Sequence, residues 1–285
     1  GLSIMLWVLT FVCVSGAVVY QRMTGPTKPL RGTLELAPEA EIAYRLLRSE
    51  NTDRDAEISL PDHAELTQVT LYYRRHGTAE PFTIVPLDRD PGTAWSATLP
   101  RQPAAGKLDY YLMVDAKGGG HRVPAQAGEN VVIRFKDPVP TAVLIPHVLM
   151  MFMALWIGLR AGAAALLEPA KARRLAWITL AALTIGGLLL GPVVQKYAFG
   201  AYWTGWPVGE DLTDTKTLVM WGGWLFAVIV ARFRKSLTVK QRGAILLATA
   251  LMIAVYLVPH SLRGSTLDYT KLDEGVPAED AIGTG

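Results

Sequence analysis

Long apolar runs alternate with polar segments along this chain. Five stretches are almost unbroken in their hydrophobicity: residues 2–19, 142–167, 175–194, 217–231 and 244–259. A helix rises about 1.5 Å per residue, so about 20 apolar residues are needed to cross roughly 30 Å of hydrocarbon. The pattern therefore predicts an all-α membrane bundle of five transmembrane helices, the fourth and fifth being the shortest.

The first apolar run has two readings, a cleaved signal peptide or a membrane anchor. The small residues Ser15-Gly16-Ala17 resemble a cleavage site. However, the run from Leu2 to Val19 is longer than the apolar core of a signal peptide, which is usually about 7 to 15 residues. We therefore expect residues 1–20 to be an uncleaved anchor helix.

Residues 21–139 have a different pattern, with short runs in which apolar and polar side chains alternate. A period of two is typical of half-buried strands. Turns such as Asp90-Pro91-Gly92 and Lys117-Gly118-Gly119-Gly120 separate the runs. The predicted strands are residues 33–36, 42–47, 56–60, 68–75, 82–87, 94–99, 108–115 and 130–135. Strands of this number and spacing predict an antiparallel all-β sandwich.

Three of these segments, residues 69–75, 95–100 and 108–115, resemble the immunoglobulin-like or fibronectin-like β-sandwiches that are appended to many bacterial surface proteins. The resemblance implies a fold and carries almost no information about activity. His63, His76 and His121 lie in or beside predicted turns, where we expect solvated histidines rather than a metal site. Since no nucleophile, base and orienting acid form a recognisable motif, we expect this domain to be an interaction module.

Orientation follows from the positive charges, which are retained on the cytoplasmic side of a membrane. Two short loops are basic; their residues are Lys171, Arg173, Arg174, Arg232, Arg234, Lys235, Lys240 and Arg242. The loop 195–216 and the C-terminal tail 261–285 are mainly acidic. This predicts a multi-pass protein of the bacterial inner membrane with a cytoplasmic N-terminus. The β domain, the loop and the tail, which we expect to be irregular, then lie in the periplasm.

Composition narrows the class of protein further. The 285 residues are 51% hydrophobic, with a mean hydropathy of +0.25, as expected for a membrane protein. The net charge is only +3, and no basic cluster is interleaved with aromatics, so we expect no nucleic-acid partner. Cys13 is the single cysteine, which excludes an internal disulfide and a cysteine-rich metal site.

Ionisable residues inside the predicted helices are candidates for function, because burying them in hydrocarbon is costly. His147 and His260 each follow a proline near the outer ends of the second and fifth helices of the predicted bundle 140–260. They could ligate a haem iron or another metal, bind a quinone headgroup, or simply be interfacial histidines. Arg160 lies towards the cytoplasmic interface, where we expect its side chain to snorkel.

The loop 195–216 is the densest local signal. Its aromatic residues are those that a membrane interface or a protein partner selects: Tyr197, Phe199, Tyr202, Trp203 and Trp206. We expect Thr213 or Asp214 to cap the following helix. Alternatively, Asp211 and Asp214 converge with His147 and His260 in an outward-facing metal site. The loop also resembles segments of bacterial polytopic membrane proteins that have similar Trp-Thr-Gly and Asp-Leu-Thr-Asp patterns. This resemblance implies no particular activity.

Three classes of function are compatible with this sequence. The first is a non-catalytic accessory subunit of a respiratory or photosynthetic membrane assembly, with lipid and other subunits as its partners. The second is a haem-, metal- or quinone-binding electron-transfer protein that uses His147 and His260. The third is a membrane enzyme or transporter with a His/Asp pocket. The first requires no special residues and no cofactor, and it is the one we expect.

Overall fold

The chain forms two compact units. The computed structural model describes all residues except 127, 233–236, 260–263 and 285. One unit is a helical bundle made by residues 1–26 and 139–264, and the other is a β unit made by residues 27–138 and 265–283. The β unit therefore combines a segment inserted between two helices with a second segment that follows the last long helix.

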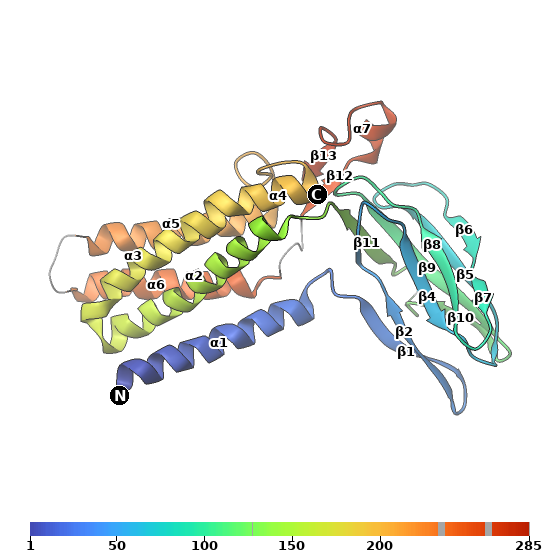
Figure 1. Ribbon diagram of the computed structural model, residues 1–285, viewed down its shortest axis with the longest axis horizontal. Helices are drawn as coiled ribbons and strands as arrows, with labels where there is room; N and C mark the ends of the chain where they lie inside the picture. Colours follow the sequence, from blue (N-terminus) through green and yellow to red (C-terminus); the bar gives the residue numbers. More distant parts are fainter. Residues whose placement is uncertain (127, 233–236, 260–263, 285) are drawn as a thin grey trace. The chain divides into compact units, whose positions relative to one another are not determined.

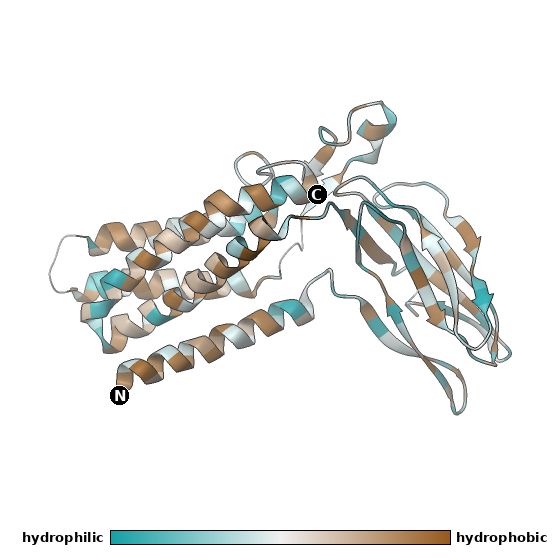
Figure 2. Ribbon diagram, viewed as in Figure 1, coloured by the Kyte–Doolittle hydropathy of each residue, from teal (hydrophilic) through white to brown (hydrophobic). Residues whose placement is uncertain are grey.

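The bundle consists of long apolar helices (Figures 1 and 2). They are α1 (Leu2–Thr24), α2 (Thr141–Leu167), α3 (Pro169–Leu183), a π-helical turn η1 (Thr184–Leu190), α4 (Gly191–Phe199), α5 (Leu212–Ala231) and α6 (Val239–Leu257). Because α3, η1 and α4 follow one another without a break, the described residues contain five helices long and apolar enough to cross a membrane. The prediction of five helices with the length and composition of membrane spans is confirmed, which supports a membrane-embedded protein.

Glycines allow α2 to approach its neighbours closely. A β-carbon at Gly158 would collide with Met252 of α6, and one at Gly162 would collide with Thr249. These two glycines are four residues apart, so they lie on the same face of α2. Small residues at this spacing are a common basis for helix packing in membranes, where close approach of the backbones replaces the hydrophobic effect.

Arg160 is placed differently from the sequence expectation. Its side chain is fully buried, with 0% exposure, rather than lying along the surface of the bundle. The guanidinium forms an ion pair with Glu168 in the turn between α2 and α3 and donates a hydrogen bond to Ser3 Oγ of α1 at 3.1 Å. The side chain does extend towards the end of its helix, but the protein rather than lipid covers it.

Strands of the inserted segment 27–138 form two main sheets and one separate hairpin (Figure 1). The larger sheet has the order β3 (Ser49–Asn51), β11 (Val131–Lys136), β9 (Lys107–Ala116), β5 (Leu66–Arg75), β6 (Thr83–Pro86), with β10 (Gly119–Val123) also paired to β9. The smaller sheet has the order β4 (Ala56–Pro61), β8 (Ala94–Leu99), β7 (Asp88–Asp90), and the hairpin is β1 (Leu30–Ala37) with β2 (Ala40–Leu46). All eight predicted strands are therefore present in residues 27–138, together with three short ones that were not predicted.

The sheets and the hairpin share one hydrophobic core. Leu71 of β5 lies opposite Leu112 of β9, and both are fully buried. Their neighbours Tyr72 and Tyr111, which also pair, are only half-buried. This alternation is the physical reason why the period-two pattern located the strands, because successive side chains of a strand point to opposite faces. β11 and β3 pair in parallel, whereas the other strand pairs described are antiparallel.

The C-terminal segment is not irregular, contrary to expectation. It contains β12 (Ser265–Leu267), the short helix α7 (Tyr269–Asp273) and β13 (Ile282–Thr284), with β12 paired to β13. A small core of its own forms around Leu267, Tyr269 and Ala281. We call residues 265–283 the tail lobe. Polar residues dominate the composition of this segment, so sequence periodicity gave no sign of its structure.

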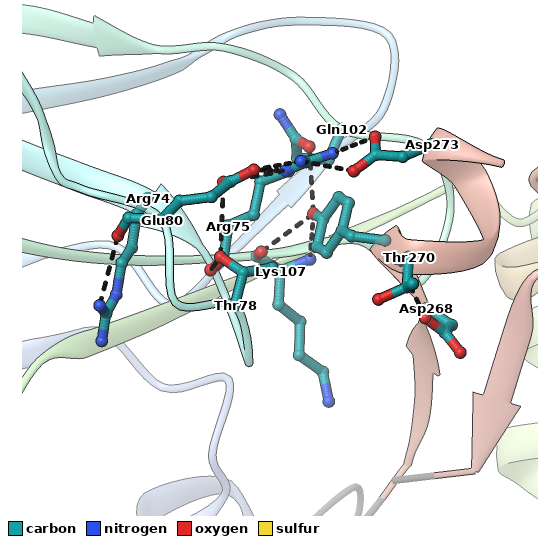
Figure 3. A network of polar contacts seen from close by, with 10 residues as sticks. Arg74, Arg75, Thr78, Glu80, Gln102, Lys107, Asp268, Thr270 and Asp273 are labelled. Atoms are coloured by element: carbon teal, nitrogen blue, oxygen red, sulfur yellow. Dashed lines mark hydrogen bonds and ion pairs between the residues drawn. The ribbon is translucent and has the colours of Figure 1, made fainter.

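Polar contacts hold the tail lobe on the β strands (Figure 3). Arg75 of β5 donates two hydrogen bonds of 2.7 Å to the carboxylate of Asp273 and also pairs with Glu80. The hydrogen bonds from Arg75 hold the pKa values of Asp273 and Glu80 below their usual ranges. The hydroxyl of Tyr269 accepts a hydrogen bond from the backbone N–H of Lys107 at 3.1 Å, and burial raises its pKa to about 12.

Candidate functional site

The segment between the third and fourth spans begins later than the sequence indicated. Helix α4 continues to Phe199, so Tyr197 and Phe199 lie on a helix and not in a loop. Gly200 ends this helix with a φ of 84°, a left-handed conformation that glycine adopts without steric cost. The irregular part is therefore residues 200–211, which we call the aromatic loop.

Asp214 of α5 fixes the middle of the aromatic loop. Its Oδ2 accepts hydrogen bonds from the backbone N–H groups of Thr204 at 2.8 Å and Gly205 at 3.1 Å. The residue is only 7% exposed. A side chain at Gly205 would collide with Asp214 itself. On the other side, Gln195 Nε2 donates to Thr204 Oγ1. The carboxylate thus satisfies two buried backbone donors that would otherwise be costly.

Asp211 is the N-cap of α5, rather than Thr213 or Asp214 as predicted. Its Oδ1 accepts from the backbone N–H groups of Thr213 at 2.7 Å and Asp214 at 3.4 Å. Its own N–H donates to the carbonyl of Thr204 at 2.9 Å. A carboxylate is favourable at this position because it satisfies N–H groups that lack partners in the first helical turn and complements the helix dipole.

The loop is folded, yet several of its apolar side chains point outwards. Trp206 is 64% exposed, Tyr202 59% and Val208 76%. The backbone of Trp206 is held from both sides: its N–H donates to Thr215 Oγ1 at 3.0 Å, and its carbonyl accepts from Trp203 Nε1 at 3.1 Å. Of the predicted aromatic residues, Tyr197, Tyr202 and Trp206 are exposed, whereas Phe199 and Trp203 are half-buried.

His147 contacts the π-helical turn of the third span. Its Nδ1 lies 2.9 Å from the carbonyl oxygen of Gly186. Because a carbonyl only accepts, Nδ1 must carry the proton and donate, and in the neutral ring Nε2 keeps its lone pair. The same carbonyl accepts the N–H of Gly191, the residue that follows η1. π-Helical turns occur frequently at functional sites.

The predicted convergence of His147, His260, Asp211 and Asp214 stays a prediction, because His260 lies outside the described residues. Within the described part of the chain, no group of three or more His, Cys, Asp or Glu side chains could hold a metal ion. Asp211 and Asp214 instead hold backbone N–H groups.

Lys216 is a buried polar residue that sequence reasoning did not single out. It lies in the second turn of α5, is 6% exposed, and its Nζ donates to the carbonyl of Val258 just beyond α6. Gln21 of α1 donates to the same carbonyl at 3.0 Å. Its position as a lone lysine close to the start of an apolar helix was the feature of the sequence that could have indicated a buried polar contact.

The three histidines of the β unit are not equivalent solvated side chains. His76 Nδ1 lies 2.6 Å from Asp109 Oδ1, and His63 Nδ1 accepts the backbone N–H of Glu65 at 3.2 Å. His121 lies in β10 rather than in a turn.

No protein-family model matches the chain, and no curated protein matches its sequence.

Proposed function

We propose that this protein is a non-catalytic accessory subunit of a larger bacterial membrane assembly of the respiratory or photosynthetic electron-transfer kind. The observation that carries the proposal is the aromatic loop, in which exposed Tyr202 and Trp206 stand on a backbone fixed by buried Asp214. Exposed tryptophan and tyrosine side chains on an already folded backbone are suited to binding a protein partner.

Preorganisation is the physical reason for preferring a protein partner. A flexible loop must be ordered on binding, and each immobilised side chain costs about 0.5–1.5 kcal/mol. Here the hydrogen bonds from the backbone to Asp214 and Thr215, and from the indole of Trp203 to the backbone, fix the loop beforehand. Tryptophan and tyrosine are enriched among residues that dominate binding energy at protein interfaces. A loop that merely lay in lipid headgroups would not need this scaffold.

The β unit offers a second contact surface in this proposal, as an immunoglobulin-like or fibronectin-like module. Tyr72 and Tyr111 stack at 4.8 Å between ring centroids on the half-buried face of the larger sheet. Phe82 packs on Tyr111 edge-on at 5.1 Å, and the guanidinium of Arg74 lies over Phe82 at 4.5 Å. Beside them Ile84 of the edge strand β6 is exposed. Aromatic and arginine residues gathered in this way favour protein recognition.

The proposal places the chain in the bacterial inner membrane. The basic residues Lys171, Arg173 and Arg174 at the start of α3 then face the cytoplasm, and the aromatic loop, the β unit and the tail lobe face the periplasm. Lys171 and Lys196 are both exposed and test this orientation. A membrane-impermeant amine reagent added to spheroplasts should label Lys196 and leave Lys171 unmodified, whereas the reverse labelling would contradict the orientation.

Extraction in mild detergent tests the subunit proposal. On a native gel the chain should migrate with other subunits, and the double variant Tyr202→Ala, Trp206→Ala should shift towards the size of the free chain. Val219→Ala is the matched control, since Val219 is an exposed apolar residue of α5 outside the loop. Recovery of the unmodified chain alone and monodisperse would overturn the proposal.

A second candidate function is electron transfer through a haem or metal ligated by His147. The favouring observation is the hydrogen bond from Nδ1 to Gly186, because metal-ligating histidines commonly donate their other ring N–H to a carbonyl and present Nε2 to the metal. The purified protein should then show a Soret band or bound metal that His147→Ala removes and His121→Ala retains. A colourless, metal-free preparation would exclude this candidate. The described residues offer no comparable observation for the enzyme or transporter hypothesis.

A further inference from the structure

Helix α1 is fastened to the bundle at both of its ends. Near its start, the carbonyl of Trp7 accepts a hydrogen bond from Trp156 Nε1 at 3.2 Å, and the two indole rings meet edge to face at 5.2 Å. Near its end, Gln21 donates to the carbonyls of Tyr256 and Val258 at the end of α6. Polar contacts of this kind fix the separation between α1 and the other helices.

Between these attachments, small side chains of α1 leave a cavity. Its volume is about 250 Å³, and it is lined by residues of α1, α2 and α6, among them Cys13, Ala17, Leu155 and Met252. The lining is almost entirely apolar, apart from the thiol of Cys13 and the ring of Tyr256. Cys13 is exposed and Ala17 half-buried, so the cavity opens at the surface of the bundle beside α1.

We propose that this crevice binds one acyl chain of a phospholipid. Its lining belongs to three membrane-spanning helices, and Cys13 is in the middle of its span, so hydrocarbon is what surrounds its opening. Water would need two to four polar partners, which this lining does not supply. An empty crevice would forfeit dispersion contacts along its walls, and α1 cannot close it without breaking the attachments at its ends. The inference requires only that the chain is embedded in a membrane and does not depend on the accessory-subunit proposal.

Photo-crosslinking of the full chain tests this site. The protein is reconstituted in phosphatidylethanolamine and phosphatidylglycerol vesicles containing phosphatidylcholine with a diazirine in the middle of one acyl chain. Adducts should concentrate on peptides carrying Cys13, Ala17 and Met252. Ala17→Phe fills the crevice and should lower their yield several-fold relative to adducts on Phe226, an exposed residue of α5. Val12→Phe adds a ring on an exposed part of α1 and should leave the yield unchanged.

Cys13 gives a second measurement that needs no substitution. In detergent, its reaction with N-ethylmaleimide should slow several-fold when phosphatidylglycerol is added. Equal adduct yields in Ala17→Phe and Val12→Phe, with Cys13 reactivity unaffected by phospholipid, would overturn the proposal. Protection of Cys13 by an isoprenoid quinone but not by phospholipid would overturn it too, because the occupant would then be a different lipid class.

Discussion

The aromatic loop and the tail lobe each follow an apolar helix along the chain, yet they are held in place by different contacts. The loop depends on one buried carboxylate, Asp214, which accepts two backbone hydrogen bonds. The tail lobe depends on a small apolar core, on hydrogen bonds of buried Tyr269 with Lys107 and of Arg134 with the carbonyl of Ser265, and on exposed ion pairs of Arg75 with Glu80 and Asp273. One buried group is therefore essential to the structure of the loop, whereas several weaker contacts together stabilise the tail lobe.

The difference has a simple cause. Buried hydrogen bonds to backbone N–H groups cannot be replaced by water, so removing the acceptor leaves the donors unsatisfied. Exposed ion pairs exchange readily with water and ions, and each contributes little. We therefore expect the loop to respond strongly to a single substitution but not to salt, and the tail lobe to respond to substitution, acid and salt, each time weakly.

The largest effect is expected for Asp214→Ala. The substitution strands the buried N–H groups of Thr204 and Gly205, at a cost of roughly 3 kcal/mol in the free energy of unfolding. Amide hydrogen exchange across residues 200–211 should accelerate, and the bundle should melt earlier in detergent. Glu210→Ala, which removes an exposed carboxylate from the same loop, is the control. Equal exchange in the two variants would show that Asp214 does not organise the loop.

A smaller effect is expected for Tyr269→Phe in the tail lobe. Tyr269 is buried, and its hydroxyl bonds with the backbone of Lys107 and with Gln102. Losing these hydrogen bonds should weaken docking of the lobe by about 1 kcal/mol. Hydrogen exchange of residues 265–283 reports this change. Tyr44→Phe serves as the control, because the Tyr44 hydroxyl makes no hydrogen bond within the described part of the chain. Unchanged hydrogen exchange in Tyr269→Phe would show that the Tyr269 hydroxyl does not stabilise the docking of the tail lobe.

Acid should loosen the tail lobe. Arg75 lowers the pKa values of Asp273 and Glu80 in the folded protein, so their contribution is complete above the ordinary carboxyl values of about 4 and is lost as the pH falls through the lowered folded values. Exchange in residues 265–283, corrected for intrinsic rates, should be constant from about pH 8 to 5 and rise a few-fold near pH 3. Arg75→Ala should abolish the rise, and an undiminished rise in that variant would exclude these pairs as its cause.

Salt should produce the smallest effect. Raising the ionic strength to about 1 M shortens the Debye length to roughly 3 Å, which screens the exposed pair of Arg75 and Asp273. Exchange of the tail lobe should increase slightly, and exchange of the aromatic loop should not change. A salt response in the loop equal to that in the tail lobe would remove the distinction between the two segments.

Periodicity was sufficient to find most of the fold. The spans and the eight predicted strands were located correctly, because a long apolar run and a period of two each have one dominant structural solution. The missed strands are three to five residues long, too short for a period to appear; they are β3, β7, β10, β12 and β13. β10 also begins at Gly119, inside a run of glycines that indicated a turn.

The site was harder to predict because its geometry depends on contacts between distant residues. The third apolar run ends at residue 194 and the loop was expected to begin at 195, yet α4 continues to Phe199. The cap was expected at Thr213 or Asp214, yet Asp211 caps α5 and Asp214 holds the backbone of Thr204 and Gly205. Burial of Arg160 likewise depends on Ser3 of another helix. Composition alone cannot decide such cases.

Site-specific photo-crosslinking in native membranes tests the central claim most directly, namely that the aromatic loop is a contact surface built on Asp214. A photoreactive amino acid is placed at Trp206 and, as the control, at Val219 of α5. We expect a discrete protein adduct at position 206 that Asp214→Ala abolishes, and no such adduct at position 219. Adducts with lipid and none with protein at both positions would contradict the proposal that the loop is a protein contact surface.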